Sequence, residues 1–188
     1  GQNLTGWRYM QRVLESISTI VPNGQKKVVC LGTVNGQKAR TAISSAFTLS
    51  TLPAAGWQIV YITGAQSITD FLAGQTVNGV NREQTGILYI TTYSHTTGDL
   101  TTAELNAINA AGPAIAHIVN TIGAGLFAMG EVGATRFAWL AAVIPGIQST
   151  LLEQTGLTLT AAGQIFLPGI TNADLSAGPW HAYFGGSF

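Results

Sequence analysis

The sequence predicts an α/β fold in which a mainly parallel central sheet is covered by helices on both faces. Short apolar runs rich in Val and Ile recur along the chain, and segments with helical spacing of apolar residues separate them. Gly, Pro and Asn punctuate these segments. The 188 residues suffice for one domain with a sizeable core. We find no internal repeat and no linker, so we expect a single domain over 1–188.

The first half of the chain predicts three strands and three helices. Apolar residues spaced by three and four predict an amphipathic helix over 4–21, which Pro22, Asn23 and Gly24 end. The predicted strands are 26–34, 57–65 and 85–93. The segment 35–56 predicts a loop and a helix, and 67–75 predicts a short helix with Ser67 as its N-cap.

In the second half, Thr101 and Glu104 form the pattern of a capping box, which predicts a helix over 100–112. The helix continues over 114–123, and Pro113 predicts a kink or break before it. We also expect a fourth strand over 125–131 and a helix from 135 to Pro145, with 149–156 as a candidate extension of that helix. One or two short strands in 157–169 and a final loop with a short helical turn complete the prediction.

Charge is scarce in this chain. Charged residues make up 9%, against roughly 25% in an average soluble domain, and eight basic residues balance eight acidic ones. No basic patch is visible, so we expect no nucleic-acid partner. A surface rich in Thr, Asn, Gln and Gly favours an extracellular or cell-surface location. No run of 18 apolar residues predicts a transmembrane helix. The chain begins with Gly and ends abruptly, so we expect it to be trimmed from a longer protein with other domains.

The sequence predicts neither a cofactor nor a metal. The segment LGTVNGQ after the first strand matches no phosphate-binding loop, although Thr33 and Asn35 are polar. His95, Glu131 and His181 lie where they could meet, but no ligand-spacing motif supports a metal site. The single cysteine, Cys30, excludes an internal disulfide framework and is expected to be a small apolar core residue.

Two stretches, TGILYITTYSHTTGDLTTAELNAINA (85–110) and IVNTIGAGLFAMGE (118–131), resemble the middle of class I glutamine amidotransferase-like domains, including the ThuA-like branch. The resemblance follows the order of elements over about 26–184 and is specific over 85–131. It implies a flavodoxin-like three-layer sandwich with strand order near 2-1-3-4. Ligands of such open sheets bind at the carboxyl ends of the strands, near the switch in strand order.

The catalytic residues of that family cannot be carried over. The amidotransferases have a nucleophilic Cys at the turn after the strand that resembles GLFAMG, where this chain has Phe127, Ala128 and Met129. They also have a late His-x-Glu pair, whereas His181 is followed by Ala182 and Tyr183. We therefore expect no glutamine hydrolysis, and we expect the turn in GAGLFAMGE to be structural.

Several polar and aromatic residues follow the predicted strands and are candidates for ligand binding. They are Ser94, His95, Asp99, Glu131, Trp180 and His181. Each has a plainer alternative: loop bracing or helix capping for the polar residues, and plugging of the core for the aromatic ones. His117 is expected to be a helix residue at the edge of the core.

The favoured function is a non-catalytic binding or assembly domain of a secreted or surface protein, with a small molecule or carbohydrate as its partner. The alternative is a ThuA-like hydrolase or carbohydrate-active protein whose site is built from His95, Glu131 and His181 at the carboxyl end of the sheet.

Overall fold

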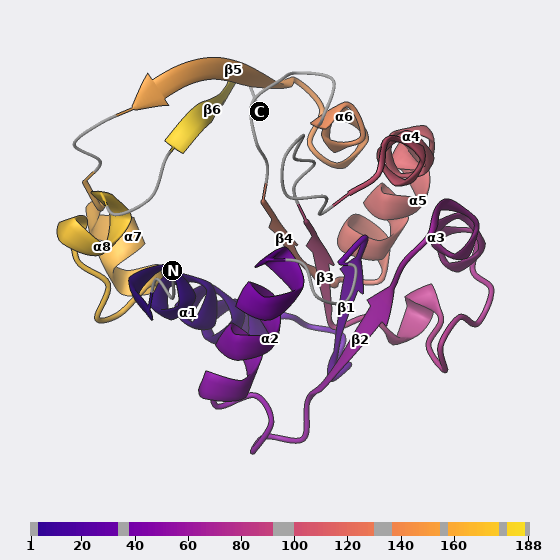
Figure 1. Cartoon of the computed structure of the whole chain (residues 1–188), viewed down its shortest axis with the longest axis horizontal. Helices are drawn as coiled ribbons and strands as arrows, with labels where there is room; N and C mark the ends of the chain where they lie inside the picture. The colour runs from indigo at the N-terminus through magenta and orange to yellow at the C-terminus, as the bar shows by residue number, and fades with distance from the viewer. Residues whose placement is uncertain are drawn as a thin grey trace.

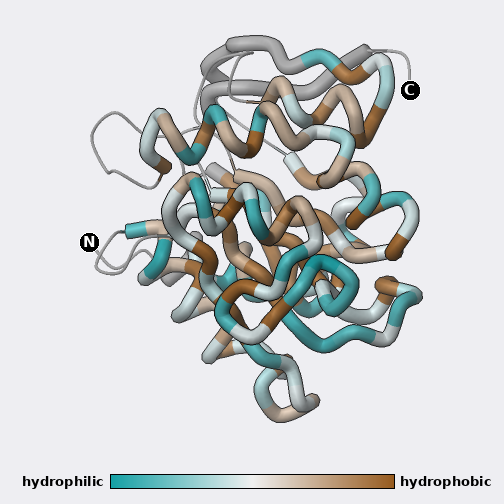
Figure 2. The backbone as a smooth tube through the Cα atoms, turned by 90° about the vertical axis from the view of Figure 1, so that its right-hand side faces the viewer, coloured by the Kyte–Doolittle hydropathy of each residue, from teal (hydrophilic) through white to brown (hydrophobic). Residues whose placement is uncertain are grey.

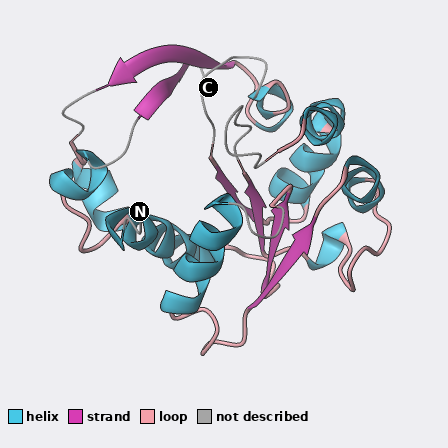
Figure 3. Ribbon diagram, in the orientation of Figure 1, coloured by secondary structure: helices cyan, strands magenta, loops and turns pink. Residues whose placement is uncertain are grey.

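A central parallel sheet organises the chain (Figures 1 and 3). The computed structural model describes residues 4–33, 38–91, 100–129, 137–154, 158–176 and 180–186. Within these residues, four parallel strands form one sheet in the order β2-β1-β3-β4. The strands are β1 (Lys27–Leu31), β2 (Gln58–Ile62), β3 (Ile87–Ile90) and β4 (Gly125–Ala128). This confirms the predicted flavodoxin-like α/β sandwich and its strand order.

The strand order places a topological switch between β1 and β3. From β1 the chain runs to β2 on one side, and it then returns to β3 on the other side of β1. In the β1–β3 pair, Val28 lies opposite Ile87 and Leu31 lies opposite Ile90. Connections that leave in opposite directions from neighbouring strands open a crevice at the carboxyl edge.

Helices cover both faces of the sheet (Figure 1). One face carries α1 (Leu4–Ile20) and α2 (Lys38–Leu49), and the other carries α3 (Ala65–Leu72), α4 (Thr102–Ala110) and α5 (Gly112–Ala116). Along these helices hydrophobic and hydrophilic residues alternate (Figure 2), as expected of helices that bury one side against a sheet. A short 3-10 helix, η1 (Arg82–Gln84), precedes β3, and a π-helical turn, η2 (His117–Thr121), follows α5.

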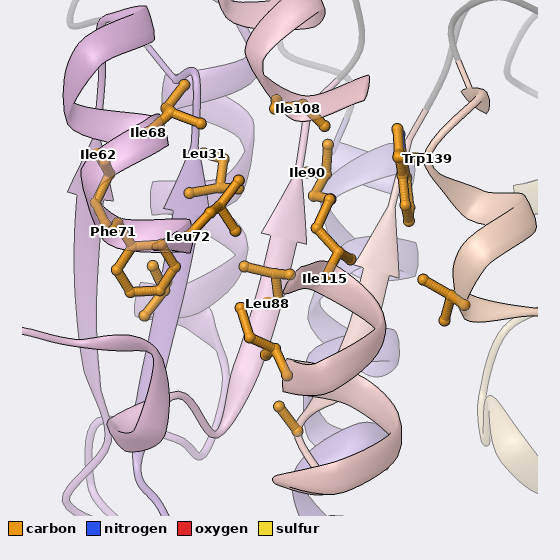
Figure 4. Packing of buried hydrophobic residues seen from close by; sticks show 14 of the residues in the cluster. Leu31, Ile62, Ile68, Phe71, Leu72, Leu88, Ile90, Ile108, Ile115 and Trp139 are labelled. Carbon is orange, nitrogen blue, oxygen red and sulfur yellow. The ribbon is translucent and has the colours of Figure 1, made fainter. Parts of the chain in front are cut away.

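The core has two layers because successive residues of a strand point to opposite faces. Leu31, Leu88 and Ile90 pack on one face against residues of α3, α4 and α5 (Figure 4). Cys30 and Tyr89 point to the other face, toward α1 and α2. With both faces covered, strands β1 and β3 are almost wholly buried, which explains their continuous apolar sequences.

The first part of the chain follows the prediction except at the start of α3. Helix α3 begins at Ala65, and Gly64 takes the N-cap position with φ of 87°. The predicted N-cap Ser67 is therefore wrong, because Ser67 lies inside the helix. The capping box of α4 is confirmed: the Thr101 hydroxyl accepts from the Glu104 amide at 3.2 Å. The break at Pro113 is also confirmed, since α5 starts at Gly112 and passes into the π-helical η2.

The C-terminal third differs from the prediction. The helix expected up to Pro145 is only α6 (Leu140–Val143) in the described residues, and its candidate extension 149–156 falls largely in strand β5 (Ile147–Gln154). The strands expected in 157–169 are replaced by α7 (Ala161–Phe166), which Thr160 caps by accepting from the Gly163 amide. The final segment holds the expected helical turn, α8 (Asn172–Ser176), and also strand β6 (Trp180–Gly186).

Strands β5 and β6 form an antiparallel two-stranded sheet that is separate from the central sheet. Thr150 lies opposite Tyr183, and Ile147 lies opposite Gly186. Both strands gain their hydrogen-bond partners from a segment about thirty residues away. Their pairing is thus a tertiary effect, which the local pattern of apolar residues does not reveal.

Candidate functional site

The structure places two of the six predicted site residues. Trp180 and His181 begin strand β6, where Trp180 lies opposite Gln154, so they are in a strand and not in the expected loop. The β5–β6 sheet lies on the side toward which the carboxyl ends of the parallel strands point (Figure 1). Ser94, His95, Asp99 and Glu131 lie outside the described residues. The ligand-binding role of these six residues stays a prediction, as does the meeting of His95, Glu131 and His181 in the alternative.

The carboxyl edge at the switch is built from the residues that follow β1 and β3. Hydrogen bonding continues past the strands, because the Gly32 amide donates to the Ile62 carbonyl at 2.9 Å and the Met129 amide donates to the Ile90 carbonyl at 3.0 Å. Gly32 has φ of 76°, a value that glycine adopts without strain. The chain therefore turns immediately after β1, and Thr33 follows that turn.

Two buried threonine hydroxyls lie at this edge. Thr33 is two residues past Leu31, and Thr91 is one residue past Ile90, the residue paired with Leu31. Thr33 is 0% exposed and Thr91 is 2% exposed. Neither Oγ1 atom has a hydrogen-bond partner among the described residues. A buried hydroxyl without a hydrogen-bond partner destabilises a fold by about 1–3 kcal/mol. These two hydroxyls are therefore candidates for contact with a ligand.

A positive charge lies beside Thr33. The Arg40 Nη1 atom donates to the Thr33 carbonyl at 3.1 Å, and the guanidinium carbon lies 3.1 Å from the centre of the Tyr61 ring. This is a cation–π contact between α2 and β2. Burial raises the pKa of Tyr61, so its phenol is protonated and neutral at pH 7. In the part of the chain that the structure describes, Arg40 forms no ion pair with a carboxylate.

A buried carboxylate, that of Glu104, lies at the same edge of the sheet near the end of β2. Glu104 is 1% exposed. Its Oε1 accepts from the Gly64 amide at 2.7 Å, and its Oε2 accepts from the Thr101 amide at 2.8 Å and the Thr101 hydroxyl at 2.9 Å. These three bonds connect the start of α4 to the turn between β2 and α3. The sequence revealed the capping box but not the bond to Gly64, which joins residues forty positions apart.

Among the described residues, neither Cys30 nor Met129 supplies a nucleophile at this edge. Cys30 is fully buried inside β1, and burial raises the pKa of its thiol far above the ordinary range, so its expected core role is confirmed. Met129, which follows β4, lies beside Tyr89, whose hydroxyl is 3.7 Å from the Met129 sulfur. Phe127 packs 5.2 Å from the Tyr89 ring, measured between ring centroids. The described residues of GAGLFAMGE, 123–129, thus pack against the core through Phe127 and Met129.

A second feature is a shallow surface groove of about 490 Å³ near the amino end of β4. It is lined by Pro113, Ala116, His117, Asn120, Thr121 and Ala142. His117 lies at the edge of the core, as expected, and its Nε2 atom is 3.3 Å from Oε1 of Glu83. Asn120 already donates to the Val143 carbonyl at 2.9 Å. The groove therefore offers one exposed His–Glu pair and mostly apolar walls.

The described residues contain no group of three or more His, Cys, Asp or Glu side chains that could hold a metal ion. No helix within the described ranges is both long enough and apolar enough to span a membrane.

Comparisons with known proteins identify no relative. No model of a known protein family matches the chain, and searches of curated proteins and of solved structures return no significant match.

Proposed function

We propose that this chain is a non-catalytic domain that binds a small polar molecule at the carboxyl edge of its sheet, between β1 and β3. One observation carries the proposal: the buried hydroxyls of Thr33 and Thr91 have no partner among the described residues, and they lie at the switch in strand order. Open α/β sheets bind their ligands at this point. A ligand that hydrogen-bonds with both hydroxyls would supply the hydrogen bonds that they lack among the described residues.

The position of these hydroxyls matters as well as their burial. Thr85 also has a buried Oγ1 atom without a partner among the described residues, but it precedes β3 at the amino edge of the sheet. The crevice that the switch in strand order opens lies at the opposite, carboxyl edge of the sheet, so Thr85 is not part of it. Thr85 therefore serves as an internal control: it shares the burial of Thr33 and Thr91 but not their place in the fold.

The proposed ligand is hydroxyl-rich or otherwise polar, such as a carbohydrate. Two neutral hydroxyls can each donate and accept a hydrogen bond, which suits sugar hydroxyls. In this proposal Trp180 and His181 contribute from β6, and Ser94, His95, Asp99 and Glu131 contribute from the segments after β3 and β4. The low charge of the chain, 9%, supports a secreted or surface location as part of the proposal.

The proposal of a domain without chemistry rests on the missing amidotransferase cysteine. The one cysteine of the chain is Cys30, which is buried within β1, and the residue after β4 is Met129. The strand order agrees with the one that the amidotransferase resemblance implies. Fold alone does not establish a function, so activity is tested directly.

The test compares Thr33→Val, Thr91→Val and Thr85→Val. Valine has the shape of threonine without the hydroxyl, so each variant removes a buried polar atom and leaves the packing in place. We expect all three variants to be more stable than the wild type, by about 1–3 kcal/mol, because each loses a buried hydroxyl without a partner. We expect Thr33→Val and Thr91→Val to weaken binding of a mono- or disaccharide about tenfold, measured by calorimetry, and Thr85→Val to leave it unchanged.

Two results would overturn the proposal. Equal binding by all three variants would show that the switch hydroxyls do not touch the ligand. Turnover of aryl esters or aryl glycosides by the wild type, abolished by His95→Ala or Glu131→Gln, would replace it with the ThuA-like hydrolase.

A further inference from the structure

We propose that the ligand carries an anionic group, a phosphate or a carboxylate, which Arg40 binds at the carboxyl end of β1. This inference rests on the proposed function and names the chemical class of the ligand for the same site.

Arg40 and the free hydroxyl of Thr33 belong to one small region. Arg40 lies in the first turn of α2, and its Nη1 atom reaches back to the Thr33 carbonyl at 3.1 Å. Thr33 is the residue whose buried Oγ1 atom lacks a partner among the described residues. The cation thus contacts the backbone of the residue whose hydroxyl lacks a partner among the described residues. Arg together with a hydroxyl is a common pairing for oxyanions.

Among the described residues, Arg40 has no carboxylate partner, whereas Arg12 and Arg82 each have one. Arg12 lies 2.7 Å from a Glu15 oxygen, and Arg82 lies 3.3 Å from a Glu83 oxygen. Arg40 is half-buried and forms no ion pair with any described carboxylate. Partial burial makes an uncompensated charge unfavourable, so an anion from outside the described fold would stabilise it.

The contacts of Arg40 leave it suited to an oxyanion. Its guanidinium lies over the Tyr61 ring, which restricts its movement. A guanidinium has five N–H donors in one plane; the Thr33 carbonyl accepts from one of them, and the Tyr61 hydroxyl is a second hydrogen-bonding neighbour. A planar, oriented guanidinium binds carboxylate and phosphate oxygens in a bidentate manner, which a flexible lysine cannot do.

The other charges at this edge favour the same ligand. Lys38 begins α2 and is exposed, and the N-terminal end of this 12-residue helix carries partial positive charge. The described carboxylate at the edge, Glu104, already accepts three hydrogen bonds from Gly64 and Thr101. Within the described residues, Arg40 and Lys38 are thus the cations at this edge, and the Glu104 oxygens are directed to Gly64 and Thr101.

The experiment is an NMR titration of the whole chain with inorganic phosphate and, separately, with acetate. Sodium chloride at equal ionic strength is the reference, because it reports nonspecific screening. We expect saturable shifts at the Gly32 and Thr33 amides and at the Arg40 side-chain Nε–H. Arg40→Gln should raise the Kd for phosphate about tenfold or more. Arg40→Lys should raise this Kd less, because lysine keeps the charge but loses the planar donor arrangement.

Arg82→Gln is the matched control. It removes one arginine that, like Arg40, donates to a backbone carbonyl, here that of Leu72 at 2.9 Å, but it lies before β3. We expect its phosphate Kd to equal that of the wild type. Circular dichroism checks that each variant is folded, and if Arg40→Gln does not fold, Arg40→Lys carries the test with an expected weakening of about threefold.

Three results would overturn the inference: no saturable shift with either anion, shifts equal to those caused by chloride, or equal phosphate binding by the wild type and the folded Arg40 variants. The failure of this inference is distinguishable from that of the proposed function. Binding of a neutral sugar that depends on Thr91 but not on Arg40 would keep the proposed function and remove the anion. No binding of sugar or anion at this edge would remove both.

Discussion

At the scale of single residues, the carboxyl edge combines groups that the fold satisfies with groups that it does not. Glu104 is buried and accepts three hydrogen bonds, whereas Thr33 and Thr91 are equally buried with hydroxyls that lack partners among the described residues. A satisfied buried group holds structure together, and an unsatisfied one is a candidate for ligand contact. In the proposed account, this difference separates the polar residues that hold the structure from those that contact the ligand.

Glu104→Ala tests the structural half of this account. The substitution leaves the Gly64 amide and the Thr101 amide without their acceptor, so we expect the free energy of unfolding to fall by about 3 kcal/mol in urea denaturation. Glu83→Ala, which removes an exposed carboxylate, should change it by less than about 0.5 kcal/mol. A loss at Glu104 no larger than that at Glu83 would contradict the role of Glu104 in joining α4 to the β2–α3 turn.

At the scale of elements, close contact between α1 and β4 depends on a residue without a side chain. A Cβ atom on Gly125 would overlap the Ile17 side chain and meet the Val21 side chain at 3.0 Å. Helix α1 therefore lies directly on the start of β4. Gly86, at the start of β3, is restricted in the same way by the Gln25 carbonyl and by the Trp57 ring, 2.8 Å from such an atom.

Gly125→Ala should separate these elements and destabilise the fold by about 2–3 kcal/mol, because the added methyl group overpacks the core. Thermal unfolding measures the effect. The control is Gly163→Ala in α7, where the added atom would approach only the Leu159 side chain, at 3.2 Å, and its own cap Thr160, at 3.3 Å. We expect that change to stay within about 1 kcal/mol. Equal effects at the two positions would show that α1 can move away from β4 without loss.

The sequence predicted the elements whose signals are local. The capping residues Thr101 and Glu104, the stop after Ile20 and the apolar runs of β1 and β3 each predicted an element that the structure contains. It did not predict the late strands β5 and β6, because each is stabilised by pairing with the other across a long loop. Ser67 failed as an N-cap because Gly64, with positive φ, starts α3 earlier.

At the scale of the whole molecule, the order of the strands decides where a site can form. The resemblance implied the order 2-1-3-4, and that order puts the switch between β1 and β3. The sequence could therefore locate the edge of the sheet but not the atoms on it. Within the described residues, the Thr33 and Thr91 hydroxyls lack partners and Arg40 lies over the Tyr61 ring, and both features depend on how segments distant in sequence meet.

The most direct test of the binding account is an NMR titration of the wild-type chain with a library of small sugars, sugar phosphates and hydroxy acids. The account predicts that the largest amide shifts for a bound compound lie at Gly32, Thr33 and Thr91, and that they saturate. Shifts centred on His117 and Asn120, in the groove near the amino end of β4, would contradict it, as would the absence of saturable shifts at the carboxyl edge with every compound.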